Sequence, residues 1–318
     1  MTKTVYRTRN WSSYNTSLKT RGSLNFWLSP EIMMAWKGHK ILSPKPHGNQ
    51  RHTDEIITFS LTIRQLFRLP LRATEGFVKS LATLMNLDLK TPDYSTLSRR
   101  SQHLKISLEH SSQEKKRHVL VDSTGVRVFG EGEWKVRQHG RSKRRLWRKL
   151  HIAMDEEDQM ILSSEVTESQ RHDGAILPLL IERIEGALYQ ITGDGAYDKK
   201  SCYRAAYKRG AKPVFPPQRD AIVQRNKHKK DPALIARDDV VKFMASGQDY
   251  KEQRKVWKQE TGYHRRSLVE NMMWRMKTLF GDEMRARSFA NQQTDLLIRC
   301  YAMNLINTLG LPQSTPIT

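Results

Sequence analysis

Three acidic residues occupy places in the sequence where a carboxylate could do chemistry. Asp122 follows the apolar run HVLV inside a β-branched segment, where a buried charge without a partner is unfavourable. Asp194 lies in ITGDGAYD at the expected end of another strand, and its flanking glycines allow a tight turn and the close approach of a ligand. Glu270 lies in TGYHRRSLVENMMWRMK, which the pattern of apolar residues predicts to be a helix.

The helix around Glu270 carries further polar residues on the same face. Tyr263, Arg266, Glu270 and Lys277 are spaced so that a repeat of about 3.6 residues per turn brings all four to one side. One carboxylate among cations is the pattern of a face that meets a phosphate and a metal ion together. We expect Tyr263, Arg266 and Lys277 to hold a phosphate backbone beside Glu270.

Oxygen ligands without cysteine suit a hard cation such as Mg²⁺. Two such ions can bind the attacking and the leaving oxygen of a phosphodiester displacement. We therefore expect Asp122, Asp194 and Glu270 to be both catalytic and metal-binding, with two Mg²⁺ ions and with Mn²⁺ as the substitute ion. Only a folded chain could bring together residues separated by 72 and 76 positions.

Each carboxylate also has a purely structural interpretation. Asp122 could cap a strand end, and Asp194 could be a turn residue that fixes GDG. Glu270 could simply pair with Arg266 four residues earlier on the helix. The residues taken one by one leave these alternatives open.

Charge is the strongest signal in the composition. The 318 residues include 55 Lys and Arg against 33 Asp and Glu, a formal net charge of +22. Residues 133–149 hold 8 basic residues and 1 acidic residue, and residues 199–230 hold 11 and 1. This excess predicts a polyanionic partner, above all a nucleic acid.

Two cysteines in unrelated contexts exclude a disulfide framework, and the longest apolar runs are too short to span a membrane. With no apolar run near the first residue, we expect a cytoplasmic protein associated with the nucleoid.

The pattern of elements suggests three parts. Residues 1–50 read as a polar, basic arm, and residues 51–112 as three helices that resemble a helix-turn-helix unit or, equally, a plain helical bundle. In the first case Arg99 and Arg100 on the third helix would contact DNA. Residues 113–312 run strand, hairpin, helix, strand, helix, strand, helix, which predicts an α/β domain with a mixed central sheet.

Several other residues invite an interpretation. Asp198 is expected to cap the helix that follows it, and Trp134 and Trp274 are expected to pack in the core, with stacking on an unpaired base as the alternative. The basic segment before the hairpin supplies further candidates for phosphate contacts, namely Arg144, Arg145, Arg148 and Lys149.

The motifs VDSTG and TGDGAYD, the spacing Y-(2)-R-(3)-E-(6)-K and the basic stretch RQHGRSKRRLWRKLH resemble bacterial insertion-sequence transposases of the DDE class, most of all the insertion-sequence-five family. The resemblance covers roughly residues 55 to 310, and no position of the four-point signature departs from it. It implies a ribonuclease-H-like mixed sheet flanked by helices and preceded by a small all-α DNA-binding domain. It also implies that Asp122, Asp194 and Glu270 bind the metal ions, in that order along the family's motif.

The activity implied by the resemblance is the binding of terminal inverted repeats, followed by cleavage of the element's end and strand transfer into target DNA without a covalent protein–DNA intermediate. Because two ends are joined, we expect at least a homodimer in the active complex. Two alternatives remain at this point. A metal-dependent nuclease or resolvase would cut without joining, and a DNA-binding repressor would do neither.

Overall fold

A computed structural model describes most of the chain as two compact units. Unit 1 combines residues 1–107 with residues 285–318, and unit 2 comprises residues 108–284. The described residues are 6–37, 52–86, 90–108, 115–129, 146–224, 231–247 and 249–316. The segment after Met284 was expected to belong with the α/β domain, yet it packs with the N-terminal helices.

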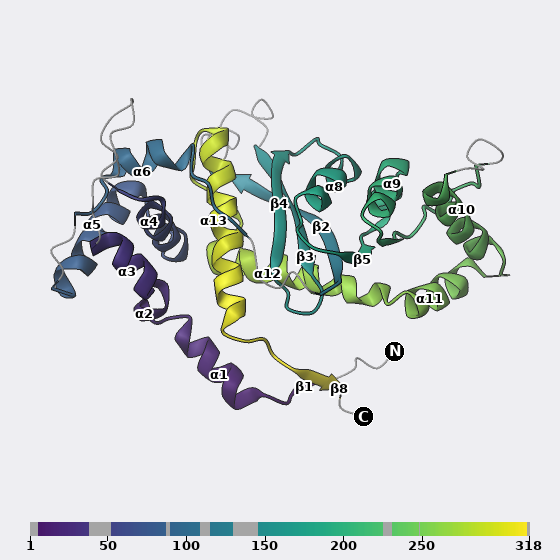
Figure 1. The fold of residues 1–318 in the computed structure, drawn as a ribbon, viewed down its shortest axis with the longest axis horizontal. Helices are drawn as coiled ribbons and strands as arrows, with labels where there is room; N and C mark the ends of the chain where they lie inside the picture. The colour runs from purple at the N-terminus through teal and green to yellow at the C-terminus, as the bar shows by residue number, and fades with distance from the viewer. Residues whose placement is uncertain are drawn as a thin grey trace, which may run out of the picture. The chain divides into compact units, whose positions relative to one another are not determined.

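Unit 1 is mainly helical and draws on both ends of the described chain (Figure 1). A two-stranded antiparallel sheet pairs Tyr6 with Pro316 and Thr8 with Ser314. The elements of unit 1 are β1 (Tyr6–Thr8), α1 (Trp11–Thr20), α2 (Leu24–Trp27), α3 (Pro30–Lys37), α4 (Asp54–Leu66), α5 (Leu71–Leu84), α6 (Tyr94–Ser101), α13 (Phe289–Thr308) and β8 (Ser314–Pro316).

The core of unit 1 forms around helix α4. Ile57 and Leu61 of α4 are buried with Leu97 of α6 and Ile298 of α13, because apolar residues recur at helical spacing on these elements. The ends of the helices are fixed locally. The Asp93 carboxylate accepts a hydrogen bond from the Thr96 backbone N–H at 2.8 Å and so caps α6.

Unit 2 is built on a mixed sheet. Its strands are β2 (Arg117–Val128), β3 (Trp147–Asp155), β4 (Ile161–Glu168), β5 (Leu188–Thr192) and β6 (Lys212–Val214), in the order β4-β3-β2-β5-β6, and β7 (Glu283–Met284) pairs with β2 outside this path. Strands β2, β3 and β4 are antiparallel neighbours, whereas β5 and β6 run parallel to β2. The first strand of the unit is thus central, and the hairpin and the parallel strands extend from its two sides.

Helices cover this sheet because the strands bury apolar residues. Val119 and Val121 of β2 share a core with Ile176 and Leu177 of α8 (Asp173–Glu182) and with Tyr203 of α9 (Lys200–Lys208). The sequence pattern therefore predicted the element order correctly. The mixed α/β fold is confirmed, and it is consistent with a ribonuclease-H-like core.

The last part of unit 2 is helical. It comprises α10 (Pro232–Ala245), α11 (Tyr250–Glu260), a 3₁₀ turn η2 (Tyr263–Arg266) and α12 (Ser267–Phe280). Gly262 lies between α11 and η2 with φ of 66°, a left-handed conformation that favours glycine and lets the chain change direction there. Trp257 of α11 packs on Tyr263 with ring centroids 5.4 Å apart, so α11 and η2 are held together.

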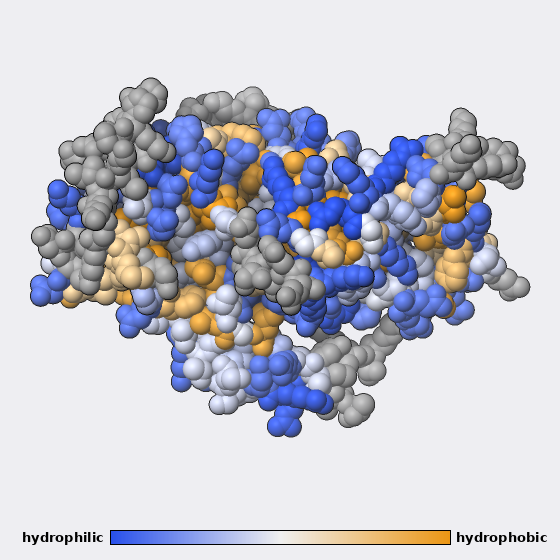
Figure 2. Space-filling model, in the orientation of Figure 1, coloured by the Kyte–Doolittle hydropathy of each residue, from blue (hydrophilic) through white to orange (hydrophobic). Residues whose placement is uncertain are grey.

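The surface is strongly hydrophilic, as the charge of the sequence requires. Figure 2 shows hydrophilic residues gathered over the middle of unit 2, with hydrophobic side chains between them. In the part of the chain that the structure describes, no helix is both long and apolar enough to cross a bilayer.

Candidate active site

The register of two parallel strands brings Asp122 and Asp194 together. Leu120 of β2 lies beside Thr192 of β5. Asp122 and Asp194 each follow two residues later, so Asp194, just past the end of β5, lies beside Asp122, which is inside the longer strand β2. The charge of Asp194 is close enough to contribute to the raised pKa of Asp122.

Asp122 is largely enclosed, with 15% of its side chain exposed. Its Oδ1 accepts a hydrogen bond from the Ser123 backbone N–H at 2.8 Å. Burial raises the pKa of this carboxyl to about 6, since the hydrogen bond to Ser123 and the guanidinium of Arg266 only partly offset the loss of solvation. Asp194 and Glu270 raise it further, which shows that three negative groups share this region.

Arg266 joins two of the three carboxylates. Its Nη1 donates to Oδ2 of Asp122 at 2.8 Å, across 144 residues of sequence, and its Nη2 donates to Oε1 of Glu270 within the same helical segment. The expected pair between Glu270 and Arg266 is therefore present, and the same guanidinium also reaches the central strand. About half of the Glu270 side chain (51%) remains exposed, so the site is open on the side of α12.

Asp194 also makes the local contact that its sequence position suggested. It is the N-cap of the 3₁₀ turn η1 (Gly195–Tyr197), where its Oδ1 accepts a hydrogen bond from the Ala196 backbone N–H at 2.9 Å. Gly193 allows this turn because a Cβ there would lie 2.5 Å from Cδ2 of Tyr197 and 2.8 Å from Cγ2 of Val121. The glycine that was expected to admit a ligand therefore admits the packing that positions Asp194.

Tyr263 lies next to Arg266 in the candidate active site. Its side chain is buried, and the guanidinium carbon of Arg266 lies 5.9 Å from the centre of its ring. Burial raises the pKa of the Tyr263 phenol. The expected contact of Tyr263 with a phosphate backbone stays a prediction, and Lys277 lies half-buried in the last turn of α12.

The donor chemistry of this site fits a divalent cation. Three carboxylates lie in one region, and a cationic group already bridges two of them. Among the described residues, however, no three acidic, histidine or cysteine side chains converge closely enough to hold a metal ion as they stand. Metal binding at Asp122, Asp194 and Glu270 would therefore require Arg266 to give up at least part of its contact with the carboxylates.

The other expected DNA contacts are scattered. Arg144 and Arg145 lie outside the described residues, as does Trp134. Arg148 and Lys149 are at the start of β3, where Nζ of Lys149 lies 3.0 Å from Oδ1 of Asp173. Lys149 therefore joins the strand to helix α8 within the unit.

The two arginines of α6 in unit 1 differ in their surroundings. Arg99 is exposed, and its Nε donates to the Ser95 carbonyl at 3.4 Å. Arg100 pairs with Asp54 and donates to the His52 carbonyl at 2.8 Å. Arg100 thus helps to hold α6 to the start of α4.

Two expectations were wrong. Asp198 does not cap α9, whose N-cap is Lys199; it is buried and bonded by both Nε and Nη2 of Arg237 on α10, at 2.7 and 3.0 Å. Trp274 does not pack in the core, since 67% of it is exposed on α12, one turn after Glu270. The long-range partner of Asp198 and the outward direction of Trp274 depend on tertiary packing that helical periodicity does not reveal.

A row of cations on α11 escaped the sequence analysis. Lys251, Arg254, Lys255 and Lys258 recur at helical spacing and line a pocket of about 370 Å³ together with Gln259 and His264. The spacing of three, four and seven residues was visible in the sequence. The signal was hidden because Glu252 and Glu260 on the same helix dilute the local charge.

Comparison with known families accounts for this arrangement. Two family models, each described as a transposase DDE domain, match this chain: one over residues 19–131 and the other over residues 113–305. The second match alone spans more than half of the chain and contains β2, β5 and α12, the elements that carry the three carboxylates. The chain belongs to the DDE transposases.

Proposed function

We propose that this chain is the transposase of an insertion sequence of the insertion-sequence-five family. It would bind the terminal inverted repeats of the element, cleave the DNA at their ends and join the freed ends to target DNA. The observation that carries this proposal is the bridge made by Arg266. It links Asp122 of the central strand β2 to Glu270 of α12, and Asp194 follows the neighbouring strand β5.

In this proposal Asp122, Asp194 and Glu270 are the catalytic carboxylates. They would hold two Mg²⁺ ions, with Mn²⁺ as the substitute, and the bound ions would supply charge stabilisation at the attacking and leaving oxygens. The family membership and the carboxylate chemistry both support this assignment. Tyr263 would keep Arg266 oriented, and the guanidinium could move from the carboxylates to a phosphate oxygen.

The proposed reaction has two displacements at phosphorus. In the first, a water oxygen bonds to phosphorus, the 3′ oxygen of the element leaves, and that oxygen takes up a proton to become a hydroxyl. In the second, this hydroxyl attacks a phosphodiester of the target, loses its proton, and releases the target's own 3′ oxygen. One phosphodiester bond breaks for each one formed in the joining step, so no external energy source is needed.

The partners follow from the reaction. Double-stranded DNA of the element ends and of the target is the substrate, and the net charge of +22 supports its binding. Because two ends must be held together, the active complex would contain at least two copies of the chain. A DNA substrate also supports the expected cytoplasmic, nucleoid-associated location.

A paired-end joining assay tests the proposal. The purified chain is incubated with a DNA that carries the ends of its element and with a supercoiled target, with and without Mg²⁺. We expect metal-dependent joining that falls by at least about 10³-fold in Glu270→Gln, in the range lost with other principal catalytic groups. The matched control is Glu182→Gln, which removes an exposed carboxylate at the end of α8 and should join normally.

The other outcomes point to the alternatives. Cleavage without joining would identify a metal-dependent nuclease or resolvase. Binding of the element ends with neither cleavage nor joining, in the wild type and in Glu270→Gln alike, would identify a DNA-binding repressor and overturn the assignment of the carboxylates.

A further inference from the structure

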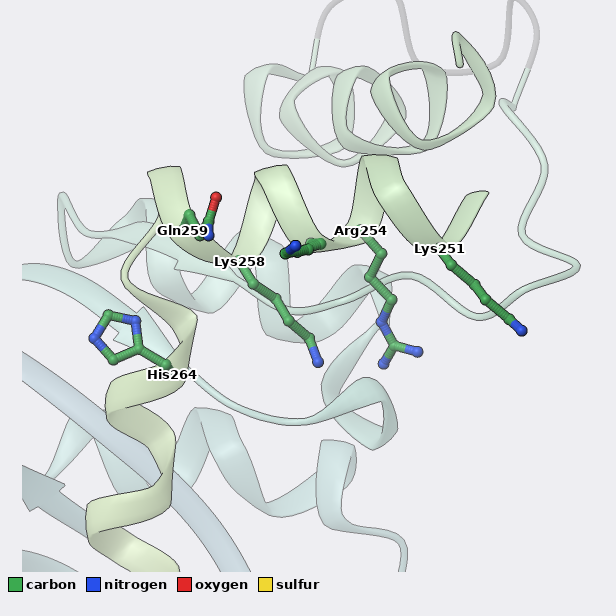
Figure 3. A pocket seen from close by; sticks show the side chains of 6 residues that line it. Lys251, Arg254, Lys258, Gln259 and His264 are labelled. Carbon is green, nitrogen blue, oxygen red and sulfur yellow. The ribbon is translucent and has the colours of Figure 1, made fainter. Parts of the chain in front are cut away.

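The cations of α11 form one face, which we call the α11 basic face: Lys251, Arg254, Lys255 and Lys258. Figure 3 shows Lys251, Arg254 and Lys258 extending to the same side of the helix, with His264 beyond the end of the row. These side chains line a hollow in the surface of unit 2 that contains no acidic lining residue. A bound anion would stabilise such a row, because neighbouring like charges on a helix destabilise each other.

No anion from the described residues reaches this face. Burial lowers the pKa of Lys258, and the charges of Arg254 and Arg266 lower it further. Nε of Arg254 is buried and has no hydrogen-bond partner among the described residues. A guanidinium nitrogen that is shielded from water and lacks an acceptor is unfavourable unless a ligand supplies one.

The α11 basic face is held firmly in relation to the candidate active site. Trp257, which precedes Lys258 on α11, is buried in a cluster with Val214, Met244 and Tyr263. Nζ of Lys258 lies 5.4 Å from the centre of the Tyr263 ring, and the same ring carries Arg266 at 5.9 Å. One aromatic ring therefore connects the last cation of the row to the arginine that bridges the carboxylates.

The length of the row matches a nucleic-acid strand. Seven residues of α-helix separate Lys251 from Lys258, a rise of about 10 Å. Phosphates of one DNA strand follow each other every 3.4 Å or so along the duplex axis, so the row spans roughly three of them. Flexible lysines with an arginine suit the contact with backbone phosphates, which is independent of base sequence.

We propose that the α11 basic face binds the phosphate backbone of the DNA strand next to the scissile phosphate and so guides that strand into the candidate active site. This inference rests on the proposed function for the place of the scissile phosphate. It adds a binding surface for about three phosphates to the three carboxylates. The packing of Trp257 on Tyr263 would keep this surface beside the candidate active site.

The test compares two triple variants of equal charge. Lys251→Gln, Arg254→Gln and Lys258→Gln are combined in one protein, and Lys199→Gln, Lys208→Gln and Lys212→Gln in the other. The control lysines are exposed residues at α9 and β6. Both proteins carry Glu270→Gln, so that binding is measured without cleavage, and fluorescence anisotropy follows the binding of an end-containing duplex at several salt concentrations.

We expect the α11 variant to lose about tenfold or more in affinity at 150 mM salt. The slope of log affinity against log salt should fall by about 2 to 3, one phosphate contact for each cation removed. The control should change much less in both quantities. Equal losses in the two variants would mean that only the overall charge matters and would overturn the proposal.

A crosslink locates the strand. Lys255→Cys introduces an exposed thiol, whereas both natural cysteines, Cys202 and Cys300, are buried. DNA with a thiol-reactive group at single phosphates should crosslink within about three nucleotides of the cleavage point. Crosslinks only at distant positions would overturn the proposal even if joining is normal. If Lys255→Cys crosslinks at the expected nucleotides while the wild type binds DNA but never joins ends, the proposed function fails and the assignment of this surface stands.

Discussion

Two arginine–carboxylate pairs, one in each unit, have the same chemistry and opposite surroundings. In unit 1, Nη1 of Arg64 lies 2.5 Å from Oδ1 of Asp295, and 9% and 5% of the two side chains are exposed. Nε of a second arginine, Arg299, bonds to Gln65 beside them at 3.0 Å, so cations outnumber the carboxylate. In unit 2, a single arginine serves Asp122 and Glu270, with Asp194 nearby, so carboxylates outnumber the cation.

The ratio of cations to carboxylates distinguishes the structural pair in unit 1 from the candidate active site in unit 2. The carboxylate of unit 1 lies among groups of opposite charge. Burial still raises the pKa of Asp295, but the guanidinium groups of Arg64 and Arg299 lower it, and no second carboxylate raises it. The carboxylates of unit 2 keep an excess of negative charge and an open side at Glu270. Burial and mutual repulsion of these carboxylates lower the free energy of unfolding, and a bound cation would offset that loss.

The largest expected effect contrasts the two aspartates. Asp295→Asn should lower the free energy of unfolding by about 3–5 kcal/mol, because it leaves Arg64 buried without its counter-ion. Asp122→Asn should instead raise the free energy of unfolding by about 1–3 kcal/mol at pH 8, because the substitution removes a charge that burial disfavours. The same substitution should abolish the joining of DNA ends. Urea unfolding monitored by circular dichroism measures both changes in stability. A loss of stability in Asp122→Asn comparable to that in Asp295→Asn would show that the two pairs are alike.

The pH dependence of unfolding provides the next comparison. Burial lowers the pKa of His151 to about 4, below the value of about 6.5 in the unfolded chain, so the folded state loses stability as the pH falls from 6.5 towards 4. The full loss is about 3 kcal/mol by the same relation. His151→Gln should remove this loss, as shown by urea midpoints measured at pH 7.5 and 5.

Asp122 should act in the opposite sense over the same range. Its folded pKa of about 6 lies above the unfolded value, so its charge costs stability above pH 6 and costs nothing below about 4. On acidification, protonation of Asp122 raises the free energy of unfolding of the wild type, and Asp122→Asn lacks this gain. The two variants should therefore show pH slopes that differ from the wild type in opposite directions. Slopes that shift together would exclude the assigned pKa directions.

A smaller effect is expected at the turn that carries Asp194. Gly193→Ala should lower the free energy of unfolding by about 1–3 kcal/mol, because the added methyl group would overlap Tyr197 and Val121. At Gly195 the nearest atom to an added Cβ is the Pro216 carbonyl oxygen at 3.4 Å, so Gly195→Ala should change stability by less than about 0.5 kcal/mol. Thermal unfolding of both variants measures the difference, and equal losses would contradict it.

The smallest effect is expected at Trp274. Because two thirds of its surface is exposed, Trp274→Ala should change the free energy of unfolding by less than about 0.5 kcal/mol. Stacking of an unpaired base on this ring, the alternative considered from the sequence, would appear only as weaker binding of DNA with unpaired end bases. The measurement is urea unfolding beside anisotropy with such DNA. A stability loss above 1 kcal/mol would show that Trp274 has a packing role.

The sequence predicted those features that depend on local pattern. Apolar runs and turn residues gave the order of strands and helices in unit 2, and they placed Asp122 inside a strand and Asp194 at the end of another. Glu270 was singled out with Arg266, and their pair is present. The roles of these residues in catalysis stay predictions until the joining assay is done.

Contacts between distant segments were beyond the sequence. Arg266 reaches Asp122 only because α12 lies on the sheet, and Arg237 takes Asp198 away from the helix it was expected to cap. Tyr263 was expected on one helix with Glu270, but it lies in the 3₁₀ turn η2 before α12 begins at Ser267, where packing with Trp257 buries it. Periodicity tells which residues share a face, and tertiary packing decides whether that face meets solvent.

The pairing of α4 with α13 determines the order in which the two units can fold during translation. Arg64 and Asp295 are 231 residues apart, so at 5–20 residues per second a ribosome makes the second about 10–50 s after the first. All of unit 2 is translated in that interval and can fold first. During that interval the apolar side of α4 lacks its contact with α13. We therefore expect unit 1 to complete its folding after unit 2, and a chaperone on the nascent chain would bind unit 1.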